Sequence, residues 1–490
     1  MYLWIGLCMT KKNTPTIVLI RRDLRLADNP ALTDAVARGG PVILLYCRET
    51  DDPDAGALGA AQAWWLHHSL TRHMTACEGL GNRIILRTGK QNDIVETLVG
   101  ETGATAIVWN RRYHRKGRET DASLKTWAKE LGLDAKSFAA NLLHEPSKLL
   151  TGAGGPYRVY TPFWKAFSSA ESFGEPLPAP SKIPAPETFP ASEALGDWTL
   201  LPKKPNWAAD FEDAWNPGEQ GGEIALAGFL EEAIRGYRTK RDFPGGTNTS
   251  HLSPHLALGE ISPLQIWHAV KQAENDRPTE DTVHFRKELA WREFSWHLLF
   301  HYPDLASKEF NPRFAGFGWD FDEKAFHAWT RGTTGYPIVD AGMRELWKTG
   351  WMHNRVRMIA ASFLIKDLMI DWRHGEQWFR DTLVDADPAS NAASWQWVAG
   401  SGADAAPYFR IFNPVLQGEK FDPKGDYVRR YVPEIASLGN EAIQKPFQAA
   451  NSVLDKADIR LGDTYPKPIV DHAHARDRAL KAYDAVKAAD

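Results

Sequence analysis

The amino-terminal part of the fold is decided by the stretch Thr16-Ile17-Val18-Leu19-Ile20, which is followed at once by Arg21-Arg22-Asp23-Leu24-Arg25. A short apolar run rich in β-branched residues is typical of a strand that is buried on both faces. No G-x-G-x-x-G motif follows this strand, so we do not expect a standard dinucleotide site in this part of the chain.

Short apolar runs of the same kind recur as far as residue 138, and helix-length segments separate them. The further candidate strands are 42–46, 83–88 and 105–109. The candidate helices between them are 30–38, 60–77, 92–101 and 119–131. Alternation of strands and helices predicts a doubly wound parallel sheet with right-handed crossovers.

The stretch 171–220 has a different composition. Nine of the 31 prolines fall between Pro176 and Pro217. Proline fixes φ and removes a backbone donor, so we expect a long extended connection here and no third domain. Tryptophans within it indicate that it packs along a surface of the protein.

From residue 222 to about 432 the pattern becomes helical, with apolar residues at three- and four-residue spacing and with Gly and Pro at the ends. The candidate helices are 224–239, 263–274, 282–300, 323–330, 338–349, 354–368 and 375–383. Ten of the 20 tryptophans lie between Trp291 and Trp397, which makes this all-α part the functional candidate. After 433 we expect a loop and a short charged helix.

Composition limits the class of protein. Hydrophobic residues make up 43% and charged residues 24%, which is typical of a globular chain and excludes disordered and fibrous classes. The formal charge of −4 means that any nucleic-acid site must be a local basic patch. Cys8, Cys47 and Cys77 show no metal-type spacing, so we expect reduced thiols in the cytoplasm. No apolar run approaches the ~20 residues needed to span a membrane.

Two polar segments are candidate binding sites. Hydroxyl residues crowd the segment 246–254 before Pro254, where hydroxyls and backbone N–H groups are able to hold a phosphate; the alternative is an ordinary helix cap. The segment 384–397 combines two acids, an amide and two tryptophans in what we expect to be a polar loop. His297 and His301 are spaced i,i+4 without a third ligand, so we expect no metal site.

The chain resembles the photolyase/cryptochrome flavoproteins from about residue 16 to about 422. Five stretches carry the resemblance: 334–341 (TGYPIVDA), 350–358 (GWMHNRVRM), 368–373 (LMIDWR), 395–397 (WQW) and 404–414 (DAAPYFRIFNP). The resemblance implies an α/β antenna-binding domain (14–145), an interdomain connector (146–221) and a helical FAD-binding catalytic domain (222–490). It leans toward the class III subgroup, which is related to plant cryptochromes.

The resemblance also places FAD in a bent pose. The residues that would hold its phosphate end are Tyr237, Thr249, Ser250, Leu252 and Ser253. Arg357 would pair with Asp385 beside the flavin ring, and Asp387 would accept from the polar edge of the ring. Asn391 falls next to flavin N5, where an amide accepts a hydrogen bond and adds no negative charge.

Further matches concern DNA and electron transfer. Glu288 matches the carboxyl group that bonds the pyrimidine dimer; without the resemblance it would be a surface residue paired with Arg292. The other DNA-contacting matches are Trp291, Asn354, Arg355, Met358 and Trp397. Histidines are absent from 354 and 358, which favours cyclobutane dimers over (6-4) photoproducts. Trp395, Trp372 and Trp319 match an electron-transfer chain, and Trp347 and Trp351 are candidates for a second branch.

The activity implied is light-driven repair: photoexcited reduced FAD gives an electron to a flipped cyclobutane pyrimidine dimer, and the dimer splits. We expect a monomer. The alternatives are a cryptochrome-type blue-light photoreceptor, against which Asn391 argues, and a dark flavin oxidoreductase. A methenyltetrahydrofolate antenna is expected, with a deazaflavin as the alternative. The usual folate site has a glutamate where this chain has Gly117, so its binding residues are not assigned.

Overall fold

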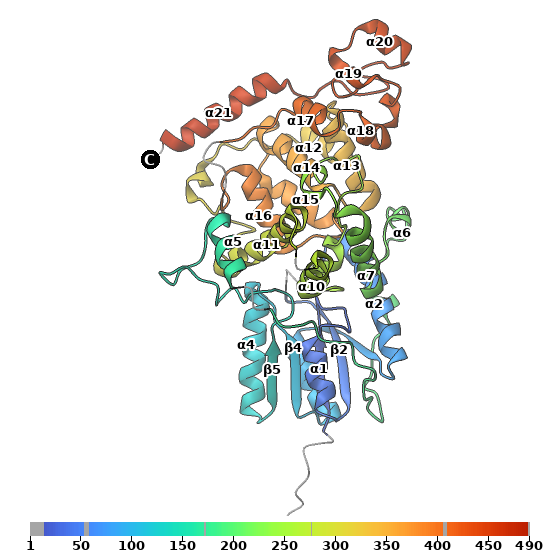
Figure 1. Ribbon diagram of the computed structural model, residues 1–490, viewed down its shortest axis with the longest axis vertical. Helices are drawn as coiled ribbons and strands as arrows, with labels where there is room; N and C mark the ends of the chain where they lie inside the picture. Colours follow the sequence, from blue (N-terminus) through green and yellow to red (C-terminus); the bar gives the residue numbers. More distant parts are fainter. Residues whose placement is uncertain (1–13, 53–57, 171–172, 276, 405–408, 489–490) are drawn as a thin grey trace, which may run out of the picture.

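The computed structural model describes residues 14–52, 58–170, 173–275, 277–404 and 409–488. A sheet with its helices forms one end of the molecule, and a larger helical part is stacked on it (Figure 1). The last helices of the chain lie at the end farthest from the sheet.

The sheet has five parallel strands in the order β3-β2-β1-β4-β5. The strands are β1 (Thr16–Ile20), β2 (Val42–Glu49), β3 (Ile84–Gly89), β4 (Ala106–Asn110) and β5 (Asp134–Phe138). In register, Thr16 is paired with Val42 on one side and with Ala106 on the other. The chain reverses its direction of winding at β1, as in doubly wound folds.

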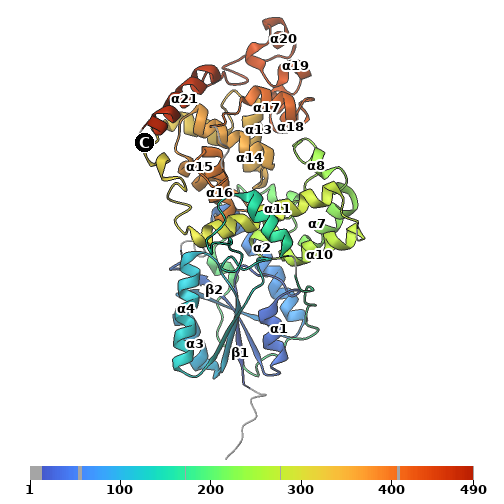
Figure 2. The same ribbon diagram turned by 60° about the vertical axis from the view of Figure 1, so that its left-hand side comes forward.

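Helices cover both faces of the sheet (Figure 2). They are α1 (Pro30–Ala37), α2 (Ala60–Gly79), α3 (Gln91–Thr102) and α4 (Arg115–Glu130). Because successive side chains of a strand point to opposite faces, Val18 and Ile20 pack in the cluster with α1 and α2. Ile17 and Leu19 pack in the cluster with α3 and α4. The predicted parallel α/β part is confirmed.

Strand β5 was not predicted. Its sequence Asp134-Ala135-Lys136-Ser137-Phe138 is polar and half exposed, because β5 is the edge strand and has only β4 as a neighbour. Edge strands commonly carry charged residues, which discourage pairing with other chains. Pairing with β4 and not an apolar pattern therefore defines this strand.

The proline-rich connector is extended, as predicted. Between α5 (Tyr160–Ser169) and α7 (Glu219–Gly228), the described residues contain only a 3-10 turn (Leu195–Trp198) and the one-turn helix α6 (Phe211–Ala214). Trp198 is buried and Trp207 and Trp215 are partly buried against the sheet domain's core. The proposed domain limits 14–145, 146–221 and 222–490 remain a prediction.

The remainder is helical, as predicted. The helices that form the functional part are α8 (Tyr237–Lys240), α9 (Ser253–Ala257), α10 (Pro263–Glu274), α11 (Glu280–His301), α12 (Glu323–Arg331), α13 (Pro337–Thr349), α14 (Asn354–Ser362), α15 (Trp372–Thr382) and α16 (Pro388–Ala399). The carboxyl-terminal helices are α17 (Pro414–Phe421), α18 (Asp426–Tyr431), α19 (Asn440–Ile443), α20 (Asn451–Lys456) and α21 (His472–Ala488).

Three expectations about the helical part were wrong. The polar segment 384–397 is not a loop, because from Pro388 onward it forms α16, with Asp387 as its side-chain cap. The predicted helix 224–239 is interrupted at Gly236, whose φ is 80°. The last helix, α21, has 17 residues and is not short.

Features that bear on the cellular setting are few. No helix in the described ranges is long and apolar enough to cross a membrane. Cys47 and Cys77 are buried and free, while Cys8 lies outside the described residues.

The junction between the two parts is held by Arg25, which is fully buried. Its guanidinium donates to the backbone carbonyls of Asp28 (3.1 Å), Ala140 (2.9 Å) and Gly259 (2.9 Å). These three carbonyls belong to the sheet domain, the segment after β5 and the helical part. A single side chain therefore satisfies acceptors from segments far apart in the sequence.

We predict that Arg25→Met destabilises the protein by about 3 kcal/mol, because buried carbonyls lose their donors. Arg38→Met is the control, since Arg38 is partly exposed and forms surface ion pairs. The first denaturant-unfolding transition of each variant measures the effect. Equal midpoints for the two variants would contradict the role given to Arg25.

Candidate functional site

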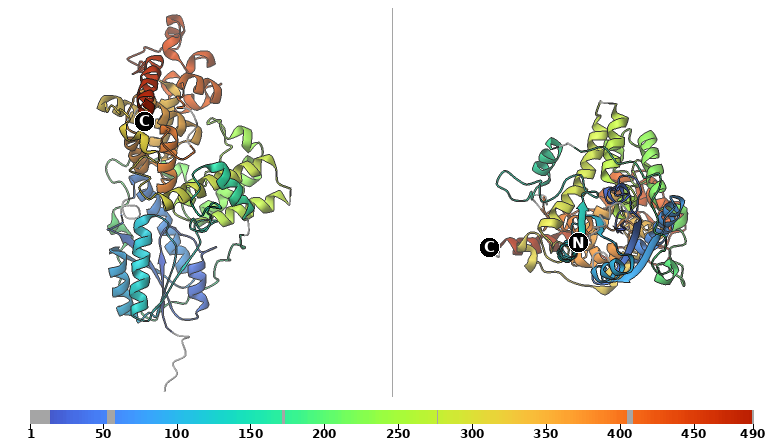
Figure 3. Two further views of the ribbon diagram at one scale, coloured as in Figure 1. Left: turned by 90° about the vertical axis from the view of Figure 1, so that its left-hand side faces the viewer. Right: turned by 90° about the horizontal axis from the view of Figure 1, so that it is seen from below.

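A cavity of about 290 Å³ in the helical part is lined by most of the residues that the sequence singled out, and we call it the main cavity. It lies where helices α8, α9 and α11 approach helices α14, α15 and α16. Figure 3 shows the first group in green to yellow and the second group in orange. Among the residues predicted from sequence, its lining includes Tyr237, Ser250, Leu252, Ser253, Glu288, Asn354, Arg357, Met358, Asp385, Asp387, Asn391 and Trp395. These residues come from segments up to about 160 positions apart, so the fold alone brings them together.

An ion pair joins Arg357 of α14 to Asp385 at one wall of the cavity. Arg357 Nη2 lies 2.8 Å from Asp385 Oδ2, and the Ser253 hydroxyl donates to the same oxygen at 2.6 Å. Asp385 Oδ1 is buried and has no hydrogen-bond partner among the described residues. This second oxygen is thus an acceptor that a ligand with an N–H or O–H group would satisfy.

Asn391 lies on α16 and is held in one orientation. Its amide nitrogen donates to Glu376 O (3.0 Å) and to Glu376 Oε1 (2.9 Å). Both partners are acceptors, so the group that faces them must be the NH₂ and the carbonyl oxygen is directed away from Glu376. Glu376 is itself buried and is paired with Arg380. Asn391 thus lines the cavity with its NH₂ held by Glu376 and its carbonyl oxygen left as an uncharged hydrogen-bond acceptor.

The start of α16 is fixed by Asp387. Its carboxylate accepts from the backbone N–H of Ser390 (2.7 Å) and from Trp296 Nε1 (3.0 Å), and Pro388 occupies the first helical position. An acidic cap followed by proline is a strong helix-start signal. The cap determines where Asn391 and Trp395 project from the helix.

The start of α14 is fixed by a neutral histidine. Burial lowers the pKa of His353 to about 4, so its Nδ1 lone pair is free at neutral pH to accept from the backbone N–H of Arg355. Glu345 accepts from the backbone N–H of His353 (3.0 Å) and from the Tyr427 hydroxyl (2.6 Å). Burial raises the pKa of Glu345 to about 7. This network positions Asn354, Arg357 and Met358 toward the cavity.

The hydroxyl-rich segment 246–254 runs along the edge of the cavity. Ser250 lines the main cavity and, together with Thr249, a neighbouring open hollow of about 530 Å³. His251 has a φ of 51° and its ring nitrogen is 3.0 Å from the Thr249 hydroxyl. Helix α9 has only five residues, so hydroxyls and not a long helix provide the polar surface here.

Glu288 and Trp291 lie on α11, and the alternative pairing of Glu288 with Arg292 is not formed. Glu288 is paired instead with Arg241, and Arg292 donates to the Asn141 carbonyl. The ring of Trp291 is stacked on Tyr160, with ring centroids 3.7 Å apart and planes 6° apart. Trp291 does not line the main cavity in the described structure.

Arg355 and Trp397 are also engaged outside the main cavity. Arg355 Nη2 is 2.8 Å from Asp242 Oδ2. The indole N–H of Trp397 donates to the Asp404 carbonyl, and its ring borders a small void beside Lys366. Burial lowers the pKa of Lys366 to about 7.

Trp395 is buried in the cavity wall and begins a series of aromatic contacts. Its ring centroid is 6.3 Å from that of Trp329, and from there the series continues through Phe326 and Trp378 in steps of 5.9 and 6.4 Å. It ends at Trp347, stacked 6.3 Å from Trp378 and 51% exposed. We call these five rings the aromatic row. Of the predicted chain, Trp372 is fully buried and Trp319 is partly buried, outside the row.

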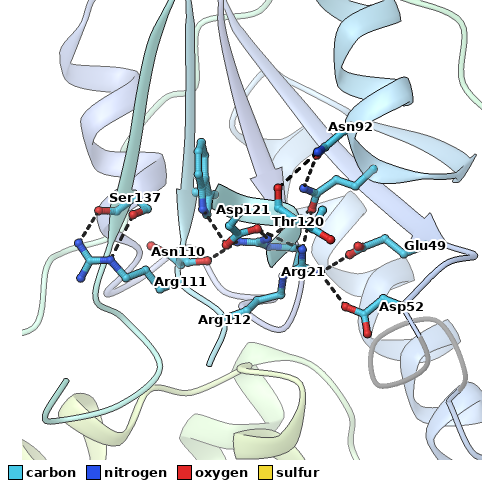
Figure 4. Close-up of polar contacts among 12 residues, drawn as sticks. Arg21, Glu49, Asp52, Asn92, Asn110, Arg111, Arg112, Thr120, Asp121 and Ser137 are labelled. Atoms are coloured by element: carbon cyan, nitrogen blue, oxygen red, sulfur yellow. Dashed lines mark hydrogen bonds and ion pairs between the residues drawn. The ribbon is translucent and has the colours of Figure 1, made fainter. Parts of the chain in front are cut away.

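Ion pairs and hydrogen bonds cluster at the carboxyl ends of the strands (Figure 4). Arg21 and Arg112 both contact Asp121, at 2.6 and 3.1 Å, and Arg112 also contacts Glu49 and Asp52. A Cβ at Gly117 would lie 2.6 Å from the ring of His114, so a glutamate there would clash. The glutamate of the usual folate site therefore has no counterpart at this position, and its neighbours leave no room for one.

Sequence reasoning missed several lining or supporting residues. Ser390, Ser394 and Arg292 line the cavity, and Glu376 orients Asn391. The i,i+4 spacing of Ser390 and Ser394 on a helix was a usable signal once the helix was recognised. Glu376 had none, because its role depends on packing between α15 and α16.

The histidine pair was expected to bind no metal. His297 is buried, its Nε2 accepts from the Tyr157 N–H, and burial lowers its pKa to about 4. In the part of the chain that the structure describes, no three His, Cys, Asp or Glu side chains are grouped to hold a metal ion.

Family models match most of the chain. Residues 16–182 match the family described as DNA photolyase, and residues 285–485 match the family described as the FAD binding domain of DNA photolyase. The second match covers Arg357, Asp385 and Asn391.

Individual relatives agree with these matches. A deoxyribodipyrimidine photo-lyase of Agrobacterium fabrum is 58% identical over 98% of this chain and 99% of its own. Cryptochrome-1 of Arabidopsis thaliana is 38% identical over 94% of this chain and 69% of its own. The crystal structure of a bacterial class III photolyase from Agrobacterium tumefaciens superposes with a TM-score of 0.95 at 57% identity, covering 98% of this chain and 99% of that one.

We predict that Gly375→Ala distorts the cavity wall, because its Cβ would lie 2.1 Å from Trp395 Cη2 and 2.7 Å from Leu364 Cδ2. Overpacking of this kind costs about 1–3 kcal/mol. We expect a lower unfolding midpoint and a lower flavin content after purification.

Gly100→Ala is the matched control, because Gly100 also lies in a helix and its Cβ would contact nothing within 4 Å. The control is expected to be neutral or slightly stabilised. If Gly375→Ala behaves like Gly100→Ala, the close packing of Trp395 against α15 is wrong.

Proposed function

Because this chain belongs to the photolyase/cryptochrome family of flavoproteins, we propose that it is a DNA repair enzyme that uses light to split cyclobutane pyrimidine dimers. The observation that carries the proposal is the cavity. The Arg357–Asp385 ion pair, the oriented amide of Asn391 and Trp395 all line it. Polar groups of opposite character are thus fixed around one chamber of ligand size.

The residues of the cavity fit FAD. The unpartnered Asp385 Oδ1 and the Ser253 oxygen, whose proton is donated to Asp385, offer acceptors, and the Ser250 hydroxyl offers a donor for a phosphate. The residues proposed to hold it are Tyr237, Thr249, Ser250, Leu252, Ser253, Arg357, Asp385, Asp387 and Asn391. When bound in its reduced form and excited by light, FAD supplies the electron that splits the dimer and receives it back.

The protein controls the electrostatics around the ring. Arg357 compensates the charge of Asp385, so that a buried carboxylate is tolerated beside the cavity. Asn391 accepts a hydrogen bond without adding charge, and Glu376 prevents its amide from rotating. We propose that a neutral acceptor at this position favours repair over signalling, because it cannot deliver a proton as a carboxylic acid would.

The DNA side of the site is proposed to consist of Glu288, Trp291, Asn354, Arg355, Met358 and Trp397. Glu288, Asn354 and Met358 line the same cavity as the flavin-holding residues. An extruded dimer would therefore meet them next to the cofactor, and extrusion costs least where base pairing is already damaged. Tyr160 covers one face of the Trp291 ring, so we propose that the opposite face of Trp291 and the ring of Trp397 stack on the extruded dimer.

The aromatic row supports a route for electrons from the surface to the cavity. Its rings are spaced about 6 Å apart and its last member, Trp347, is exposed. Trp395 would serve this row and the chain through Trp372 and Trp319 alike. Four of the five rings are indoles, which are able to carry the charge in steps, and Phe326 fills the space between Trp329 and Trp378. Solvent at Trp347 stabilises the charge left behind.

A second candidate function is a cryptochrome-type photoreceptor, which the 38% identity to Cryptochrome-1 favours. It shares the fold and the cofactor, so only repair activity separates the two. We further propose that the protein is a cytoplasmic monomer, which the free, buried thiols of Cys47 and Cys77 support as regards the compartment. A methenyltetrahydrofolate antenna also remains a proposal.

We predict that holoprotein with reduced flavin restores a dimer-containing oligonucleotide under blue light and leaves it unchanged in darkness. No light-dependent restoration by the wild type would favour the photoreceptor.

In a binding assay in darkness, we predict that Trp291→Ala weakens the binding of dimer-containing DNA by about 1–3 kcal/mol, because only an extruded base is able to stack. Binding of undamaged duplex should not change. Trp347→Ala is the control.

We predict that Trp395→Phe blocks light-driven reduction of the oxidised flavin, because both proposed electron routes reach the cavity through Trp395. Repair should persist when the flavin is reduced chemically. Trp267→Phe, a buried tryptophan of the other helical core, is the control for lost packing. Photoreduction at the wild-type rate in Trp395→Phe would refute both routes.

A further inference from the structure

Two adjacent residues after helix α8, Arg241 and Asp242, reach two of the proposed DNA-contacting residues. Arg241 is paired with Glu288 of α11, and Asp242 is paired with Arg355 of α14 at 2.8 Å. Helices α11 and α14 are separate elements, so this dipeptide bridges them. We call Arg241 and Asp242 the clasp.

The clasp neutralises its partners. Two guanidinium groups and two carboxylates are paired, so these four side chains contribute no net charge at this end of the cavity. The positive charge of Arg355 is therefore already compensated before DNA arrives. Nothing in the proposed function explains why a DNA-contacting arginine should be paired with an acid.

The surroundings of Arg355 favour an anion at the place where Asp242 lies. The guanidinium carbon is 4.4 Å from the centre of the Phe421 ring, and the guanidinium's Nε is buried without a hydrogen-bond partner among the described residues. The aromatic ring holds the planar group in place, and its Nη2 donates to the Asp242 carboxylate. Carboxylate and phosphate oxygens bind a guanidinium fork in the same way.

We propose that Asp242 is an internal competitor of the DNA phosphate at Arg355. The inference rests on the proposed function, because it requires that Arg355 binds the DNA backbone. A phosphate that takes the place of Asp242 must first break the ion pair. Asp242 therefore acts through Arg355, as a residue that sets the affinity for DNA.

The Arg355–Asp242 ion pair determines how much the DNA affinity changes and whether the change differs between damaged and undamaged duplex. The side chains of Arg355 and Asp242 are 19% and 33% exposed, and partly exposed ion pairs change an equilibrium by about 1.4- to fivefold. Any backbone phosphate has to open the ion pair, so Asp242 weakens the binding of damaged and undamaged duplex equally. The competitor leaves discrimination unchanged and shortens the time spent on undamaged DNA.

Salt dependence provides a second signature. When phosphate displaces Asp242, the freed carboxylate takes up a cation from solution. This uptake offsets part of the counterion release that makes DNA binding salt-dependent. Removal of the carboxylate should therefore steepen the salt dependence by up to about one unit in the slope of log affinity against log salt.

The test is a titration of holoprotein, in darkness, with fluorescent duplexes that do or do not contain one dimer, at several salt concentrations. We expect Asp242→Asn to bind both duplexes about 1.4- to fivefold more tightly at low salt and with a steeper slope. Asp34→Asn is the matched control, because it removes the same charge from an ion pair with Arg38 in the sheet domain. Arg355→Gln and the double variant complete the cycle.

The double-mutant cycle tests whether Asp242 changes the DNA affinity through Arg355. In the Arg355→Gln background, Asp242→Asn should give no more gain than Asp34→Asn gives in the wild type. The proposal is overturned if Asp242→Asn weakens DNA binding, matches Asp34→Asn, or retains its gain without Arg355. Failure of the proposed function looks different: the wild type then neither prefers dimer-containing DNA nor repairs it in light, whatever Asp242→Asn does.

Discussion

The ion pair between the partly buried Arg357 and the buried Asp385 is the interaction on which the rest of the site depends. It joins α14 to the turn that precedes α16, and Ser253 ties the hydroxyl-rich segment to the same carboxylate. Removing one partner of such a pair leaves an uncompensated buried charge, which costs several kcal/mol. The cavity can therefore keep its shape only while the three segments stay together.

The polar groups around the cavity are of two kinds, which differ in whether their hydrogen-bond acceptors are all used. Groups that point away from the ligand space are saturated: Glu376 accepts from Asn391, and Glu345 accepts from His353 and Tyr427. Groups that face the space keep an unused acceptor, as Asp385 does. The chamber is thus organised before any ligand enters, which lowers the entropy lost on binding. At the proposed DNA side, the clasp pairs the charges that the substrate would meet.

The sequence was informative where one physical cause dominates. Strand β1 was predicted at its observed limits because burial on both faces demands a continuous apolar run. Strand β5 was missed because an edge strand is specified by its neighbour. Helix α16 was taken for a loop although Asp387 and Pro388 mark its start, since polar residues obscured the helical period. The pair of Arg357 and Asp385 followed from family motifs. The pairing of Arg355 with Asp242 links positions 113 residues apart and has no local signal.

The central claim is that the cavity receives a base lesion drawn out of the duplex beside the flavin-holding residues. The most direct measurement uses 2-aminopurine, placed opposite the dimer, as a fluorescent report of lost stacking in darkness. The account predicts a rise in fluorescence when holoprotein binds the dimer-containing duplex and no rise with undamaged duplex of the same sequence. No change with the damaged duplex, or an equal rise with both, would contradict it.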